Sequence, residues 1–283
     1  MKPGAGNQKQ RVNLWHLGFG DLLAERGSPG VKVVSEWSLP VRARRTDFLL
    51  IRRQDGQQHD REARSLRALW PRLSDITIME LKSPGRAFRP SELIRLVACG
   101  ALYHEHNRRE LAGPHAITLA DVLPGFTPSL RDEIAHMGWT LEPLEPGYAR
   151  ILGVMYTTYV AFTNEIAEAE DDDYLRVFSD HEIRTAETTS WLHHWMLEKK
   201  TMLDPKLIKP EGYEEMMAKI AESLTPEERL RGLPPEERLR GLDEEQTLLA
   251  LPVSVLRHLS EDYLRSFSPA VQQVVRERIA RGH

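Results

Sequence analysis

The spacing of hydrophobic and polar positions predicts an ordered succession of helices and strands in the first half of the chain. Leucines recur at helical intervals over 13–26, which predicts a helix there. Short apolar runs rich in β-branched and aromatic residues predict strands over 31–39, 46–51 and 75–81. The chain therefore opens with one helix and three strands.

A second helix and more strands are expected further along. Ser91, preceded by a proline, is the N-cap candidate of a helix that runs to about residue 107. A strand is expected over 116–122, and Thr127 is the N-cap candidate of the next helix. The β-branched and aromatic residues of 148–162 are suited to one or two strands.

Two segments connect these elements and complete the predicted fold class. Between the second and third strands, the polar residues 54–61 predict a loop and residues 62–69 a short helix. The order helix, three strands, helix, strand favours an α/β domain with a mixed sheet flanked by helices. From about Thr163 the pattern becomes helical and charged.

The C-terminal part contains an internal repeat, because Pro226–Leu233 recurs unchanged as Pro235–Leu242. Each PEERLRGL copy starts with proline, carries two acidic residues in its first turn and ends near glycine, as short helices do. We expect a flexible leader over 1–12, an α/β domain over 13–215 and a helical tail over 216–283. The tail would pack on itself or on a protein partner.

Composition narrows the class of protein. No apolar run approaches the roughly 20 residues needed to cross a bilayer, and the basic leader lacks the apolar core of a secretory signal. The single cysteine, Cys99, excludes an internal disulfide framework and fits a reducing compartment. We expect a cytoplasmic protein that makes no membrane contact.

Charge is distributed unevenly along the chain. The net charge of −4 argues against a protein that coats nucleic acid by bulk electrostatics. Basic residues nevertheless cluster in the N-terminal half and acidic residues in the C-terminal half, which permits a local phosphate-binding face. A solvated surface with arginine–glutamate pairs explains the same distribution equally well. The clustered arginines are Arg42, Arg44, Arg45, Arg52 and Arg53, and acidic residues gather at 168–173 and after Glu211.

Asp47, Glu80 and Lys82 form the strongest candidate for chemistry. Residues two apart in a strand share a face, so Glu80 and Lys82 project together, while Leu81 is buried behind them and can offer its carbonyl to a metal. Asp47 begins an otherwise apolar strand, where an unpartnered carboxylate is costly to bury. Carboxylates suit Mg²⁺, and an ammonium can orient water or stabilise developing charge during phosphodiester hydrolysis. A solvent-facing aspartate and a plain Glu80–Lys82 ion pair are the alternatives.

The segments RTDFLL around Asp47 and IMELKSP around Glu80, followed by the helix SELIRLVACGALYH, resemble the PD-(D/E)xK nuclease superfamily. They are most similar to its transposase-associated, recombination-promoting branch, whose C-terminal extensions the tandem repeat also resembles. The likeness covers about 12–125. It implies a restriction-endonuclease-like core in which Asp47 and Glu80 bind Mg²⁺, with Mn²⁺ able to substitute, and Lys82 serves the attacking water.

The resemblance also implies a further acidic metal ligand on the first helix. Asp21 is the first choice, with Glu25 and Glu36 as alternatives. One departure is Thr46, which stands where the family has proline.

The leading hypothesis from the sequence is a Mg²⁺-dependent DNA endonuclease linked to recombination or mobile elements, acting as a homodimer or higher oligomer. The alternative is a catalytically inactive nuclease-fold scaffold that binds a protein partner through its C-terminal helices. The residues expected to contact DNA phosphates are Arg44, Arg45, Arg86 and Arg89.

Other polar groups are interpreted as structural. His104 and His106 diverge on a helix, and His193 with His194 lies between tryptophans that indicate packing. The acidic residues 168–173 lack a calcium-loop pattern and are expected to be solvated. No glycine-rich phosphate loop or zinc-type cysteine spacing occurs, so ATP-driven and zinc-based chemistry find no support.

Overall fold

A computed structural model describes residues 13–38, 45–53, 56–86, 88–202, 211–224 and 244–281. The chain forms two compact units, Met1–Leu224 and Thr225–His283. Across the described ranges, no helix is both long and apolar enough to cross a membrane.

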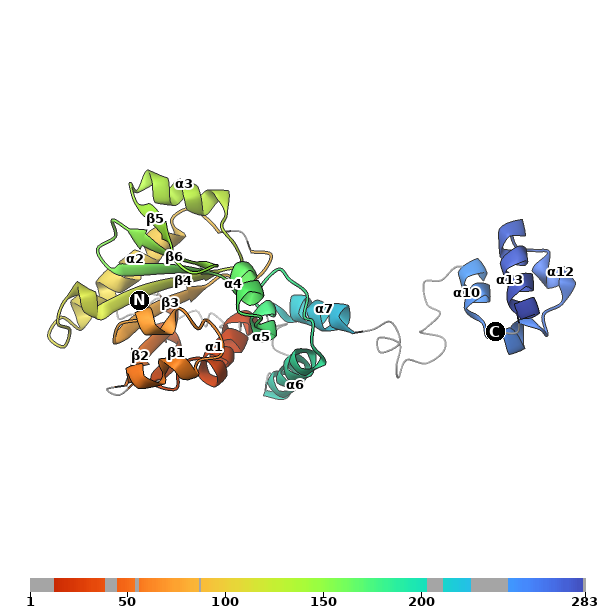
Figure 1. Cartoon of the computed structure of the whole chain (residues 1–283), viewed down its shortest axis with the longest axis horizontal. Coiled ribbons are helices and arrows are strands. Elements are labelled where there is room, and N and C mark those ends of the chain that lie inside the picture. The colour runs from red at the N-terminus through yellow and green to blue at the C-terminus, as the bar shows by residue number, and fades with distance from the viewer. Residues whose placement is uncertain are drawn as a thin grey trace, which may run out of the picture. The chain divides into compact units, whose positions relative to one another are not determined.

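The first unit contains a seven-stranded sheet and the helices that cover it (Figure 1). The strands are β1 (Val31–Ser38), β2 (Arg45–Arg52), β3 (Ile76–Leu81), β4 (Ile117–Leu123), β5 (Thr140–Pro143), β6 (Tyr148–Leu152) and β7 (Thr157–Phe162). The helices are α1 (Leu14–Arg26), α2 (Glu92–His106), α3 (Pro128–His136), α4 (Thr163–Ala169), α5 (Asp173–Arg176), α6 (Ala186–Met202) and α7 (Tyr213–Ser223). Short 3-10 helices span Gly56–Glu62, Trp70–Arg72 and Pro114–Ala116.

The sheet is mixed, with strand order β1-β2-β3-β4-β7-β6-β5. β1, β2 and β3 form an antiparallel meander, and β6 and β5 continue antiparallel from β7. At the centre, β4 is parallel to both β3 and β7, and α2 connects β3 to β4. The predicted α/β class and mixed sheet are therefore confirmed.

The two faces of the sheet carry separate cores. α1 covers one face, where Phe19 and Leu22 pack with Phe48 and Met79. α2 and α3 cover the other face, and their buried residues contact strand residues such as Ile78. Because strand side chains alternate between faces, a residue's position decides which helix it meets. The α2 face of β2, β3 and β4 carries the polar residues described below.

Most predicted elements are confirmed, with three differences. The polar segment expected to be a loop over 54–61 forms a 3-10 helix from Gly56 to Glu62. The helix expected over 62–69 is wrong: the segment forms the end of a 3-10 helix and turns, with Leu66 at a φ of 53°. β5 was not predicted, because it is four residues long and mostly exposed, and so carries almost no apolar alternation. The segment 148–162 is confirmed as two strands, β6 and β7.

The start of α2 differs in its capping from the prediction. Ser91 occupies the N-cap position with a φ of 72° but makes no side-chain capping bond. Instead the buried carboxylate of Glu133 on α3 accepts from Ser91 N at 2.9 Å and from Ile94 N at 3.0 Å. A side chain from α3 thus satisfies the free N–H groups that every helix start exposes. The predicted cap of α3 is confirmed, since Thr127 Oγ1 accepts from Leu130 N.

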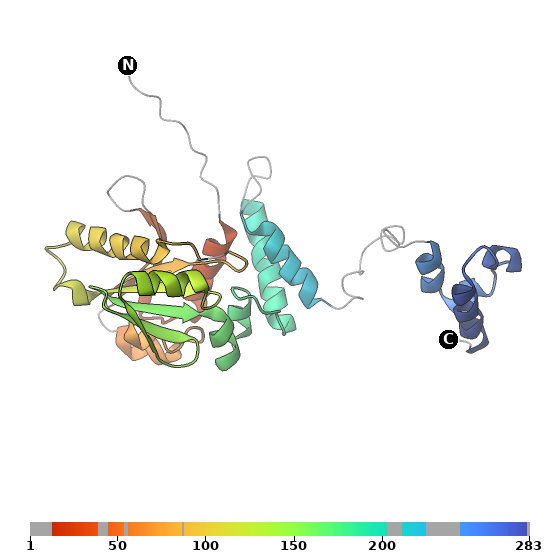
Figure 2. The ribbon, with the colours of Figure 1, turned by 90° about the horizontal axis from the view of Figure 1, so that it is seen from above.

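Helices α4 to α7 complete the first unit. α6 and α7 pack against each other (Figure 2), and Met216 and Ile220 of α7 join the α1-side core. The expected domain boundary at 215 falls inside α7, whereas the first compact unit continues to Leu224.

The second unit is described over 244–281. It consists of α10 (Glu244–Ala250), α11 (Val253–Leu256), α12 (Glu261–Leu264) and α13 (Pro269–Arg281). Leu248, Leu256, Leu264 and Val275 form its own core, so the predicted helical character is confirmed here. The tandem PEERLRGL repeat lies outside the described residues.

Candidate functional site

Three carboxylates lie side by side on the α2 face of the sheet. Glu80 on β3 pairs directly with Asp121 on the parallel strand β4. On the other side of β3, the antiparallel register Phe48↔Met79 brings Asp47 of β2 next to Glu80. Lys82 follows Glu80 by two residues and therefore projects from the same face.

Asp47 is anchored to β3 through a backbone hydrogen bond. Leu81 N donates to Asp47 Oδ2 at 2.9 Å, so the aspartate side chain takes a main-chain donor of the neighbouring strand. Its other oxygen, Oδ1, lies 3.4 Å from His16 Nδ1 on α1. The Asp47 side chain keeps 16% of its surface exposed. These contacts fix it beside the Glu80–Lys82 segment and leave it accessible at the edge of the site.

Glu80 is the buried centre of the row, with 4% of its surface exposed. Its Oε2 lies 3.4 Å from the guanidinium of Arg95 on α2, and its Oε1 has no hydrogen-bond partner among the described residues. Burial, followed by the negative charges of Asp47 and Asp121, raises the pKa of Glu80 to about 8 against the opposing effects of Lys82 and Arg95. At neutral pH, and without a bound metal ion, the protonated form of the Glu80 carboxyl is therefore favoured.

Lys82 is held by the first turn of α2. Its Nζ lies 3.2 Å from Glu92 Oε1, and both side chains are largely buried. Arg95 lies one turn further along α2, 3.9 Å from the same Glu92 oxygen. Because Glu133 fixes the start of α2, the positions of Glu92 and Arg95 over the sheet are set by α3 as well.

Sequence reasoning missed Asp121. This residue is 1% exposed, and its Oδ1 has no hydrogen-bond partner in the described part of the chain. Burial raises the pKa of Asp121 to about 7. The signal was present in the sequence, because a single carboxylate interrupts the otherwise apolar strand ITLADVL as Asp47 interrupts TDFLLI.

The residues predicted as a further ligand on the first helix face away from this row. Asp21 Oδ2 accepts from Trp195 Nε1 at 2.8 Å and pairs with Lys199 Nζ at 3.0 Å, so it faces α6. Glu25 accepts from Trp191 Nε1 of the same helix. The structure thus does not bring Asp21 or Glu25 to Asp47, and His16 is the α1 residue that contacts it. The side chain of Glu36 lies outside the described residues.

Two open clefts flank the Lys82–Glu92 pair. The first, of about 410 Å³, is lined by Lys82, Arg86 and the 41% exposed ring of Phe126, among others. The second, of about 490 Å³, is lined by Arg89, Glu92 and Arg95, among others. Both predicted arginines, Arg86 and Arg89, therefore border the site from outside.

The other predicted phosphate-binding residues have different outcomes. Arg44 lies outside the described residues, and Arg45 begins β2 with its side chain undescribed. Arg52, part of the basic cluster, is buried against Asp60 at 2.9 Å and donates to two backbone carbonyls. Arg52 is therefore neither an exposed phosphate-binding residue nor part of a solvated surface of arginine–glutamate pairs, so neither alternative describes it.

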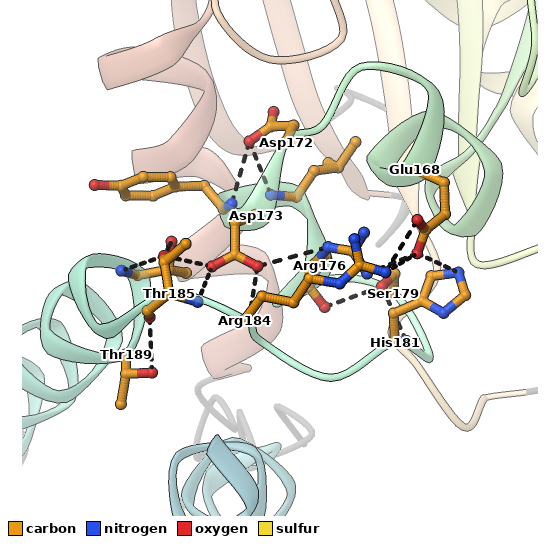
Figure 3. Close-up of polar contacts among 12 residues, drawn as sticks. Glu168, Asp172, Asp173, Arg176, Ser179, His181, Arg184, Thr185 and Thr189 are labelled. Atoms are coloured by element: carbon orange, nitrogen blue, oxygen red, sulfur yellow. Dashed lines mark hydrogen bonds and ion pairs between the residues drawn. The ribbon is translucent and has the colours of Figure 1, made fainter. Parts of the chain in front are cut away.

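A second polar cluster connects α4, α5 and the start of α6 (Figure 3). Arg176 is 2% exposed and pairs with Glu168 at 2.7 Å, while Asp173 accepts from the backbone of Arg184 and Thr185. Asp172 is buried and caps α5. The expectation that 168–173 is a solvated acidic stretch is correct for the exposed residues Glu168, Ala169 and Asp171. It is wrong for the buried Asp172, which caps α5, and for the half-buried Asp173, which accepts from the backbone before α6.

Metal-binding capacity depends on how closely the carboxylates approach one another. Within the described ranges, no three His, Cys, Asp or Glu side chains are already gathered as a metal-binding group. Asp47, Glu80 and Asp121 are neighbours in the sheet, and Arg95 balances part of their charge. The unpartnered, buried Oε1 of Glu80 nevertheless fits a cation ligand, because a buried carboxylate oxygen is stabilised by a metal or a donor.

Comparisons of the chain with family models, with curated proteins and with solved structures gave no match. Function must therefore be inferred from the residues and their geometry. The arrangement offers hard oxygen ligands beside a fixed ammonium, with basic clefts on either side. Oxygen ligands of this kind suit a divalent cation, and a fixed ammonium can stabilise negative charge.

Proposed function

We propose that the protein is a Mg²⁺-dependent DNA endonuclease of the PD-(D/E)xK type, with a role in recombination or in mobile elements. The observation that carries the proposal is the hydrogen bond from Leu81 N to Asp47 Oδ2. Leu81 lies between Glu80 and Lys82, so this bond places the carboxylate of the RTDFLL segment next to both of these residues. The strand order around it, an antiparallel meander followed by a helix and a parallel strand, supports the same assignment.

Each residue has a distinct role in this proposal. Asp47 and Glu80, with the carbonyl of Leu81, would hold Mg²⁺ or Mn²⁺. The bound ion would supply Lewis acidity toward the scissile phosphate. Lys82 would orient the attacking water or stabilise the charge that develops on the phosphate oxygens.

Two residues of α2 support Lys82 and Glu80. Glu92 Oε1 lies 3.2 Å from Nζ of Lys82, an ion pair that positions the ammonium beside the carboxylate row. Arg95 neutralises part of the charge on Glu80 and has a side chain that is 44% exposed. Its exposure allows the guanidinium to turn toward a phosphate oxygen when DNA occupies the neighbouring cleft.

DNA would approach along the clefts beside Lys82. Arg86 and Arg89 lie outside the carboxylate row and can contact phosphates on either side of the scissile bond. Phe126 offers an exposed aromatic ring in the first cleft, with the Arg131 guanidinium 5.9 Å from its centre. Aromatic and basic groups together are typical of surfaces that bind nucleic acid.

The experiment is a cleavage assay with purified full-length protein, supercoiled plasmid and Mg²⁺ or Mn²⁺. We expect Asp47→Asn, Glu80→Gln and Lys82→Met each to reduce nicking by at least about 100-fold. The exposed Asp132→Asn on α3 serves as a carboxylate control and should cleave like the wild type. Equal nicking by all five proteins would refute the assignment.

A non-catalytic scaffold is the second candidate, supported by the separate core of the C-terminal unit. In this case a partner binds through residues 244–281, whose exposed hydrophobic residues include Val255, Tyr263 and Val274. A variant ending at Leu224 distinguishes the two. An endonuclease should retain divalent-dependent cleavage after truncation, whereas a scaffold should show no cleavage in either form and lose its partner.

A further inference from the structure

Asp121 and Glu80 are neighbours on paired strands and share one property. Each is a buried carboxylate in the middle of the sheet, and each has one oxygen without a hydrogen-bond partner among the described residues, Asp121 Oδ1 and Glu80 Oε1. Buried polar atoms in folded proteins are nearly always paired. Glu80 and Asp121 face each other on neighbouring strands, and each has a carboxylate oxygen without a hydrogen-bond partner. This combination indicates that one cation binds to both oxygens.

The geometry of the sheet allows both residues to reach one ion. Neighbouring strands lie about 4.8 Å apart, and Glu80 and Asp121 project from the same face at the same level of their parallel strands. Mg²⁺ binds oxygen at about 2.1 Å. Carboxylates on adjacent strands can therefore approach one ion from both sides after small side-chain rotations.

The cations already present do not occupy this position. Lys82 directs its ammonium to Glu92, at 3.2 Å. Arg95 approaches only the other oxygen of Glu80, Oε2, at 3.4 Å, and its side chain is half exposed. Neither cation therefore engages Oε1 of Glu80, which is left for a small cation from solution.

We propose that Asp121 is a ligand of the divalent cation, placed on the opposite side of Glu80 from Asp47. One row of three carboxylates, from β2, β3 and β4, then holds Mg²⁺ or Mn²⁺, and Arg95 turns away from Glu80 when the ion binds. The inference rests on the cation site of the proposed function, and it does not require that the protein cleaves DNA.

The test is a titration of Mn²⁺ into the full-length protein without nucleic acid, followed by calorimetry and by the electron paramagnetic resonance signal of free Mn²⁺. Asp121→Asn preserves side-chain shape and should weaken Mn²⁺ binding by at least about tenfold. Asp132→Asn removes an exposed carboxylate elsewhere and should bind like the wild type. Thr77→Val changes a buried polar side chain on β3 that points to the opposite face, and it should also leave Mn²⁺ affinity unchanged.

The outcomes separate this inference from the proposed function. If Asp121→Asn binds Mn²⁺ like the wild type while Asp47→Asn does not, the role of Asp121 is overturned and the endonuclease proposal stands. If Mn²⁺ binding depends on Asp121 in a protein that nicks no plasmid, the ligand assignment holds and the endonuclease proposal fails. A folded wild-type protein, checked by circular dichroism, that shows no saturable Mn²⁺ binding overturns the inference.

Discussion

The replacement of Asp121 by asparagine should change stability in a strongly pH-dependent way. Loss of hydration in the buried sheet raises the pKa of the Asp121 carboxyl from 3.8 to about 7. The charged groups that face it come from β2, β3 and α2: Lys82 and Arg95 lower this pKa, and Glu92 and Asp47 raise it. The pKa of the neighbouring Glu80 is raised as well, to about 8.

The sign of the effect follows from proton binding in the two states. Between about pH 4 and pH 7 the carboxyl of Asp121 is ionised in the unfolded chain and protonated in the folded one. The folded state therefore binds more protons, so the free energy of unfolding falls as pH rises through this window. The stabilisation is complete below the unfolded pKa and is lost as pH rises through the folded pKa.

The magnitude follows from the width of the window. Each unit of pKa difference corresponds to about 1.36 kcal/mol. Between pH 5 and pH 7 the wild-type protein should lose on the order of 3 kcal/mol through Asp121, and the asparagine variant should lose none of it. Asp121→Asn should therefore be close to wild type at pH 5 and more stable at pH 7.

Urea unfolding in the presence of EDTA, followed by tryptophan fluorescence, measures this difference. All six tryptophans precede Leu224, so the signal reports the first unit alone. Asp132→Asn on the exposed face of α3 controls for the loss of a carboxylate. A stability difference between wild type and Asp121→Asn that stays constant within about 0.5 kcal/mol from pH 5 to pH 7 would refute the reasoning.

Three further predictions concern α2 and the adjoining clefts. Glu133→Ala leaves two partly buried N–H groups at the start of α2 unpaired and should lower the free energy of unfolding by about 0.5–2 kcal/mol in urea titrations; unchanged stability would contradict this capping role. Glu92→Gln should reduce kcat for plasmid cleavage by about tenfold with little change in DNA affinity, because it removes the carboxylate that positions Lys82; a change confined to DNA affinity would count against this role. Arg86→Ala should weaken DNA binding and lower the slope of log affinity against log salt by about one, whereas the exposed Arg109→Ala should not; identical slopes would exclude a phosphate contact at Arg86.

The strands and the Glu80–Lys82 pair were predictable because they depend on local periodicity. Alternation over two residues is enough to place Glu80 and Lys82 on one face. The short β5 was not predictable from periodicity, since its pairing with β6 is what makes it a strand. The expected helix over 62–69 failed for a related reason, because the left-handed Leu66 is buried in the core and tertiary packing overrides the local pattern.

The partners of the site residues were harder to predict, because they depend on which elements meet in space. Asp21 and His16 lie on the same helix, but only the packing of α6 against α1 decides that Asp21 contacts Trp195 while His16 contacts Asp47. Asp121 stands out in the sequence as the one charged residue of its strand, but its place beside Glu80 depends on the pairing of β4 with β3. The pairing register of β2, β3 and β4, rather than the strand propensity of each segment, brings Asp47, Glu80 and Asp121 into one row.

The two polar clusters of the first unit illustrate how a structural site differs from a candidate cation site. Around Arg176 the native contacts favour the ionised carboxylate, and a hydrogen bond from Arg176 lowers the pKa of Glu168 to about 2. On the sheet the opposite holds, because burial raises the pKa of Glu80 and Asp121. Buried carboxylates whose ionisation the fold opposes cost stability at neutral pH relative to acidic pH, and hydrophobic residues in place of buried charged groups are often neutral or stabilising. Such carboxylates cluster where function requires them, and a divalent cation is the ligand that would reverse the charge imbalance at this row.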